Sequence, residues 1–132
     1  MAKILCVDDD PEIVRIKQTI LEQAGYQVTA CTTVADALRT LRSDSFDAIV
    51  TDWRLGEDSG RSIVQAVRQD AAAAVPVVVV SGSVAEAFQS SEPLADLYHE
   101  KPAHPGELVK VLEALLRTRP VAAPVEQAPK PF

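Results

Sequence analysis

The sequence predicts an α/β fold: a doubly wound, five-stranded parallel sheet with helices on both faces. Two observations lead to this class. Short β-prone segments alternate with helical patterns along the chain, and the segment from Pro76 to Val80 is apolar throughout, as expected of a strand covered on both faces. Right-handed crossovers between parallel strands then place helices on both sides of the sheet.

The first predicted elements are strands over residues 3–7 and 27–31 with a helix between them. The first strand stops at an acidic loop, Asp8 to Pro11, and Gly25 ends the helix. The helix is predicted by four apolar residues at helical spacing: Ile13, Ile16, Ile20 and Ala24.

The alternation continues through the middle of the chain. Thr32 and Thr33 can cap a helix, and a third strand runs from Phe46 to Thr51 and ends at Asp52. A glycine-containing loop and a third helix follow before the strand at 76–80. The first of these helices carries Ala37, Leu38 and Leu41 on one face, and the second is marked by Ile63, Ala66 and Val67.

The pattern is weaker after residue 81. Val84 to Gln89 allows a short helix that Pro93 interrupts, and a fifth strand is predicted within 94–99. The last helix has a clear apolar face, made by Leu108, Val111, Leu112, Leu115 and Leu116. We therefore expect one domain over residues 1–118 and a proline-rich disordered tail or linker over 119–132.

Composition and charge exclude several classes of function. The 132 residues are 47% apolar and 24% charged, as in a soluble domain that needs no disulfide or metal to fold. The net charge of −6 is opposite to that of a nucleic-acid or anionic-membrane binder. Because no signal-peptide pattern or long apolar run is present, a cytoplasmic location with reduced, buried Cys6 and Cys31 is expected.

Polar residues stand at the carboxyl ends of the predicted strands, where such sheets bind ligands. They are Asp8 and Asp9 after the first strand, Asp52 at the third, Ser81 at the fourth and Lys101 after the fifth. Carboxylates brought together need a cation, and oxygen ligands without His or Cys favour Mg²⁺. Asp52 could then attack a phosphoryl donor while Lys101 and Ser81 contact the phosphoryl oxygens.

Four segments carry a family resemblance: Ile4 to Glu12, Asp47 to Asp52, Val79 to Gly82, and Lys101-Pro102. Together, in this order and at these strand ends, they resemble the receiver domain of two-component response regulators, over about residues 3–117. The resemblance implies a flavodoxin-like sheet with strand order 2-1-3-4-5. It also implies a phosphoacceptor signalling domain rather than an enzyme.

The resemblance assigns a role to each matching position. Asp52 matches the phosphoacceptor, and Mg²⁺ would be held by Asp8, Asp9, Asp52 and the backbone carbonyl of Arg54. Ser81 matches the switch hydroxyl. Lys101 matches the lysine that pairs with the phosphoryl group, and Tyr98 matches an aromatic residue that moves with the switch.

The resemblance also implies partners: a histidine kinase or histidine phosphotransfer protein as donor, and a downstream protein that reads the switch. The chain is similar both to single, chemotaxis-type receivers and to receivers of hybrid histidine kinases. No output domain is expected in the tail, and the irregular fourth helix favours a monomer or weak dimer. Gly56 replaces a proline found in many receivers and is expected to make its loop less stiff.

The same residues allow other interpretations. An aspartate-nucleophile phosphatase would carry a second Asp two residues after the nucleophile, where this chain has Arg54. A degenerate receiver could act as a phosphorylation-independent binding module. For single residues, Tyr98 could be an ordinary half-buried strand residue, and Asp10 is best explained as a helix cap.

Overall fold

The computed structural model describes residues 2–69, 75–82, 95–100 and 105–118. Five parallel strands form the sheet in the order β2-β1-β3-β6-β7, which confirms the predicted topology. Their bounds are β1 Lys3–Val7, β2 Gln27–Cys31, β3 Ala48–Asp52, β6 Val77–Ser81 and β7 Leu97–Glu100. The third strand begins two residues later than predicted, after the buried Phe46, and ends at Asp52.

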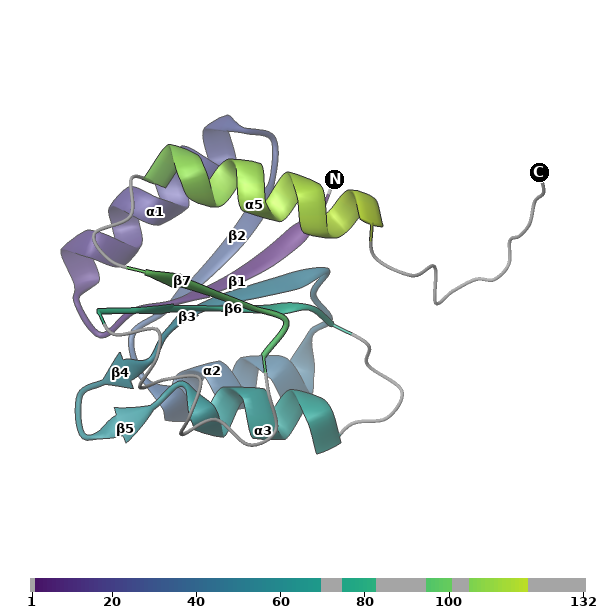
Figure 1. Ribbon diagram of the computed structural model, residues 1–132. Coiled ribbons are helices and arrows are strands. Elements are labelled where there is room, and N and C mark those ends of the chain that lie inside the picture. Colours follow the sequence, from purple (N-terminus) through teal and green to yellow (C-terminus); the bar gives the residue numbers. More distant parts are fainter. Residues whose placement is uncertain (1, 70–74, 83–94, 101–104, 119–132) are drawn as a thin grey trace.

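Among the described residues, four helices cover the sheet, two on each face (Figure 1). Helices α1 (Pro11–Gln23) and α5 (Pro105–Thr118) pack side by side on one face, and α2 (Val34–Ser43) and α3 (Arg61–Gln69) lie on the other. A small antiparallel hairpin of β4 (Arg54–Leu55) and β5 (Asp58–Ser59), which the sequence did not predict, follows β3. This hairpin lies beside the end of the sheet where Asp52 is located.

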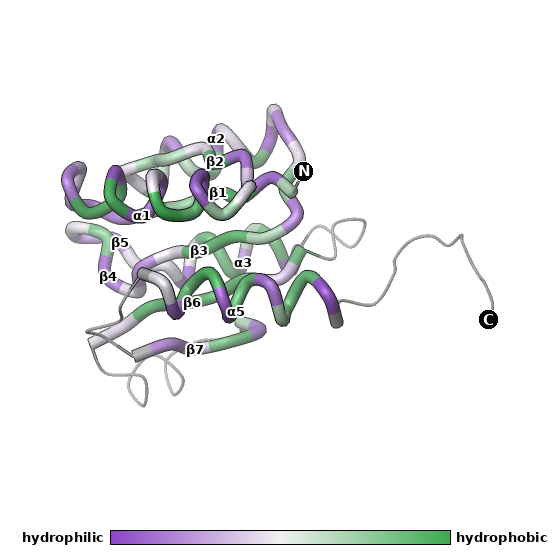
Figure 2. The backbone as a smooth tube through the Cα atoms, turned by 90° about the horizontal axis from the view of Figure 1, so that it is seen from above, coloured by the Kyte–Doolittle hydropathy of each residue, from purple (hydrophilic) through white to green (hydrophobic). Residues whose placement is uncertain are grey.

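The core is divided by the sheet into two apolar layers. Side chains alternate along each strand, so Leu5 and Ile49 pack toward α2 and α3 while Ile4 and Val50 pack toward α5. Figure 2 shows a mostly hydrophobic β6, whereas hydrophobic and hydrophilic segments alternate along α1 and α5. Since β1, β3 and β6 are buried along almost their whole length, the strand ends are held in fixed positions.

Local capping explains where the first two helices begin. The Asp10 carboxylate accepts hydrogen bonds from the backbone N–H groups of Glu12 at 2.9 Å and Ile13 at 3.3 Å, and Pro11 occupies the first turn of α1. Thr33 caps α2 by accepting from the N–H of Asp36 at 3.1 Å. The predicted capping role of Asp10 agrees with these contacts.

The apolar residues whose spacing predicted α1 do not form its buried face. Ile13 and Ile16 are 41% and 50% exposed, Ala24 is exposed and Ile20 is half-buried. The buried residues are Val14, Lys17 and Leu21. Both sets have helical spacing, and the second was overlooked because a lysine stands at its centre.

Several predictions concern residues outside the described part of the chain. They are the short helix at 84–89, the Lys101-Pro102 pair and the tail at 119–132. Cys6 and Cys31 are both buried and free, as predicted. Within the described residues, none of the helices has the length and apolar character that crossing a membrane requires.

Candidate functional site

Three carboxylates meet at the carboxyl edge of the sheet. Strands β1 and β3 pair in register with Val7 opposite Thr51, so the next residues, Asp8 and Asp52, are neighbours at the strand ends. Asp8 and Asp52 are each 2% exposed, whereas Asp9 is exposed. One ligand oxygen from each of the three lies within 4.8 Å of the others, and we call this group the acidic cluster.

Close backbone packing holds Asp52 in place. The hydroxyl of the buried Thr51 donates to the carbonyl oxygen of Asp52 at 3.0 Å, and the N–H of Gly60 donates to the carbonyl of Trp53 at 2.7 Å. A Cβ on Gly60 would lie 2.4 Å from the Asp52 carbonyl oxygen, so only glycine fits there. The loop after β3 therefore packs closely against the backbone of Asp52, the predicted phosphoacceptor.

Asp9 is held by Gly56, which lies in the turn between β4 and β5. The backbone N–H of Gly56 donates to Asp9 Oδ2 at 3.1 Å, and Gly56 has a positive φ of 66°. Proline could provide neither the N–H nor the positive φ. Glycine at this position therefore connects the loop to the acidic cluster.

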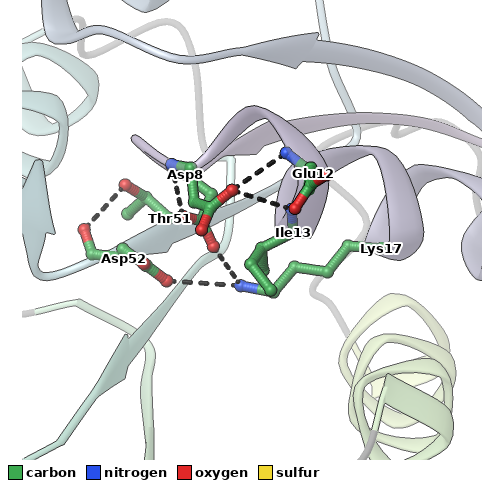
Figure 3. Close-up of polar contacts among 7 residues, drawn as sticks. Asp8, Glu12, Ile13, Lys17, Thr51 and Asp52 are labelled. Carbon is green, nitrogen blue, oxygen red and sulfur yellow. Dashed lines mark hydrogen bonds and ion pairs between the residues drawn. The ribbon is translucent and has the colours of Figure 1, made fainter.

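A lysine lies inside the acidic cluster, and sequence reasoning missed it. Lys17 extends from the buried face of α1, and its Nζ lies 2.9 Å from Asp8 Oδ2 and 3.3 Å from Asp52 Oδ1 (Figure 3). Only 8% of Lys17 is exposed. Its spacing between Val14 and Leu21 was the one sequence signal that could have placed it on the inner face of the helix.

These contacts change the protonation equilibria of the site. Burial alone would raise the pKa of Asp8, but the hydrogen bond from the Asp10 N–H and the contacts with Lys17 hold that pKa below its usual value. Burial alone would lower the pKa of Lys17, and Asp52 and Asp8 together raise it above the ordinary lysine value. At neutral pH the lysine is charged and Asp8 is ionised.

The other predicted site residues are placed as follows. Ser81 ends β6, is 5% exposed and lies one residue beyond Val80, which pairs with Asp52. Tyr98 on β7 is half-buried against the core layer under α2 and α3, and its hydroxyl accepts from the N–H of Ala95 at 3.0 Å. Arg54 is exposed on β4. Lys101 lies outside the described residues.

The donor set fits a hard divalent cation. All three side chains of the acidic cluster offer carboxylate oxygens, and the described neighbours include no imidazole or thiolate ligand within this group. A site with only oxygen donors, partly open to solvent through Asp9, suits Mg²⁺, which keeps several of its waters. The fold and site together define a doubly wound α/β domain whose carboxyl edge carries three clustered carboxylates with the oxygen donors that a hard divalent cation prefers.

Comparison with known proteins identifies the family. The model of the response regulator receiver domain matches residues 4–113, so the chain belongs to this family of two-component signalling domains. Protein PetR of Rhodobacter capsulatus is 34% identical over 119 residues, which cover 90% of this chain and 50% of PetR. The chain spans about half the length of the curated relatives it matches.

Solved structures support the same fold. The chemotaxis response regulator CheY4 of Vibrio cholerae superimposes with a TM-score of 0.78 at 27% identity, covering 87% of this chain and 98% of CheY4. The response regulator TrrA of Thermotoga maritima, solved in complex with Mg²⁺ and BeF, has a TM-score of 0.78 at 23% identity and covers 87% of this chain and 99% of TrrA. The flavodoxin-like architecture expected from the sequence is confirmed.

Proposed function

We propose that this chain accepts a phosphoryl group on Asp52 from a phosphohistidine, with Mg²⁺ held by Asp8, Asp9, Asp52 and the backbone carbonyl of Arg54. The donor would be a histidine kinase or a histidine phosphotransfer protein. The observation that supports this most directly is the acidic cluster, in which a buried carboxylate at the end of a central strand has two others within 4.8 Å. The complex of TrrA with Mg²⁺ and BeF supports the same choice of cation.

In the proposed reaction, a carboxylate oxygen of Asp52 forms a bond to phosphorus while the bond between phosphorus and the histidine nitrogen breaks. The electron pair of the broken bond stays on the histidine nitrogen, and Asp52 becomes an acyl phosphate. Bound Mg²⁺ would neutralise charge on the carboxylates and the phosphoryl oxygens. Ser81 would donate a hydrogen bond to one phosphoryl oxygen, and Lys101 would pair with another.

The same site would pass the signal on by protein contact. Movement of Ser81 toward the phosphoryl group would free space for Tyr98, whose ring lies half-buried on the neighbouring strand. A downstream partner protein would read the altered surface. We propose a cytoplasmic monomer or weak dimer without direct nucleic-acid or membrane binding, which acts alone or within a longer chain.

The test is the intact mass of the protein after incubation with acetyl phosphate or phosphoramidate, with and without Mg²⁺. We expect one added phosphoryl group that requires both Mg²⁺ and Asp52. Asp52→Asn removes the acceptor, and Asp58→Asn is the matched control because it removes an exposed carboxylate on β5 outside the acidic cluster.

The outcomes separate the phosphoacceptor from the binding module. An adduct on the native chain and on Asp58→Asn, but not on Asp52→Asn, supports the proposal. If the native chain forms no adduct at short times with excess donor and binds no beryllofluoride, the phosphorylation-independent binding module replaces it. An adduct that survives in Asp52→Asn would place the acceptor elsewhere.

A further inference from the structure

The proposed phosphotransfer leaves one buried charge unused. The Lys17 ammonium is held inside the acidic cluster by two ion pairs, one to Asp8 and one to Asp52. The side chains of all three residues are at most 10% exposed, so water screens these charges weakly. Figure 3 shows the side chain reaching from α1 across to the ends of the two strands.

A cation in this position offsets the electrostatic cost of burying two carboxyl groups side by side. Asp8 and Asp52 are neighbouring carboxyl groups, each 2% exposed, and negative charge placed on both would be costly because they are close together and removed from water. The Lys17 ammonium offsets both effects, because one nitrogen contacts an oxygen of each carboxylate. The acidic cluster is therefore partly neutralised by a group that belongs to the protein itself.

We propose that Lys17 is a resident counter-ion that weakens the binding of Mg²⁺ at the acidic cluster. This inference rests on the proposed function, which places Mg²⁺ there. Two of the three carboxylates that would bind the metal already bind Lys17. The ammonium would also lie within a few ångströms of a bound divalent cation, and at that distance like charges repel strongly where water is scarce.

The position of Lys17 on α1 allows a clean substitution. Its helical neighbours on the buried face are Val14 and Leu21, so the aliphatic part of the lysine lies on an apolar stripe. Lys17→Met keeps a long unbranched side chain and a high helix propensity while removing the charge. Lys110→Met, on the exposed part of α5, removes the same charge at a distance and is the matched control.

The experiment is titration of the full chain with MgCl₂ by isothermal calorimetry, with the fluorescence of Trp53, next to Asp52, as a second readout. We expect Lys17→Met to bind Mg²⁺ about ten-fold more tightly than the native chain, or more, because a like charge has been removed from the site. Lys110→Met should stay within about two-fold of the native affinity, since solvent and salt screen its charge.

Each alternative outcome overturns the inference in a recognisable way. Unchanged or weaker binding to Lys17→Met would mean that the lysine and the metal do not compete, while leaving the Mg²⁺ site of the proposed function intact. An equal increase in Mg²⁺ affinity in Lys110→Met would mean that the change in affinity comes from the net charge of the protein and not from the position of Lys17. Absence of Mg²⁺ binding in all three proteins would remove the metal site itself, and with it the metal-dependent part of the proposed function.

Stability measurements keep the inference testable if the charge is needed for folding. Lys17→Met leaves two buried carboxylates without their cation, so we expect a lower Tm than native without Mg²⁺ and a larger rise in Tm when Mg²⁺ is added. Lys17→Arg keeps the charge and should retain the native Mg²⁺ affinity within about three-fold. Tightening in Lys17→Arg equal to that in Lys17→Met would contradict a role for the charge.

Discussion

Two glycines fasten the loop after β3 for different reasons. Gly56 has a φ of 66° and open space around its Cα, so a side chain would meet no neighbour but would strain the backbone. Gly60 has no such φ, yet a Cβ there would lie 2.4 Å from the carbonyl oxygen of Asp52. Backbone conformation therefore requires the first glycine, and close packing against the Asp52 backbone requires the second.

Alanine substitutions should separate these two requirements. Gly56→Ala is expected to lower the free energy of unfolding by about 1 kcal/mol, the cost of a left-handed conformation for a residue with a Cβ. Gly60→Ala should cost about 3 kcal/mol, because the Asp52 backbone has to move. Gly82→Ala, which meets nothing within 4 Å, is the control and should change stability by less than about 0.5 kcal/mol.

Urea unfolding of the three variants measures these differences. A Gly60→Ala variant as stable as the native chain would mean that the loop moves away from Asp52 at little cost. The close approach in the structure would then not be what holds the loop in place.

At the residue scale, the sequence predicted the carboxylates of the site but not their surroundings. Asp8, Asp9 and Asp52 follow from where strands end, because parallel strands bring their carboxyl ends together. The position of Lys17 in the site was not predicted, since a charged residue is normally expected on the solvent face of a helix. The contact between Gly56 and Asp9 joins residues 47 positions apart and depends on the loop conformation, which residue types alone do not specify.

The elements were predicted from periodicity, and α1 marks the limit of that method. Its bounds were predicted well because Asp10, Pro11 and Gly25 mark its ends. Periodicity did not predict which face of α1 is buried, because the helix carries two stripes with similar spacing. One stripe consists of three isoleucines, and the other of Val14, Lys17 and Leu21. Burying the second stripe lets Lys17 reach the acidic cluster, whose charge compensates for burying a lysine.

The two stripes of α1 should respond differently to truncation. Leu21→Ala is expected to lower the free energy of unfolding by about 3 kcal/mol, because the 1% exposed leucine packs in the core layer under α5. Ile16→Ala should change it by less than about 0.5 kcal/mol, since half of that side chain is already exposed. Chemical denaturation of both variants tests this, and a larger loss for Ile16→Ala would reverse the orientation assigned to the helix.

The whole molecule is organised around its central strands. Strand β1 lies between β2 and β3, with helices over both faces, so the Cys6 side chain meets water only when the domain unfolds. The order of strands was predicted from the family resemblance, and the burial of β6 from its apolar composition. The β4-β5 hairpin escaped prediction because two-residue strands are too short to show a periodicity.

This central burial predicts how the stability of the whole domain depends on alkaline pH. Burial raises the pKa of the Cys6 thiol from 9.0 to about 12, although the nearby Lys17 opposes part of that rise. Above about pH 9 the unfolded chain loses this thiol proton while the folded chain keeps it, so raising the pH favours unfolding. The stabilisation that the neutral thiol provides is complete below pH 9 and is lost as the pH rises toward 12.

Comparison with Cys6→Ala isolates this contribution. Between about pH 8 and about pH 10 the free energy of unfolding of the native chain should fall by about 1.3 kcal/mol more than that of Cys6→Ala. Most of this loss falls above about pH 9, where unfolding releases the Cys6 thiol proton. Urea unfolding at several pH values gives both curves, and all other titrating groups are common to the two proteins. Parallel curves would mean that the thiol ionises equally well in the folded chain, which would require water to reach the centre of the sheet without global unfolding.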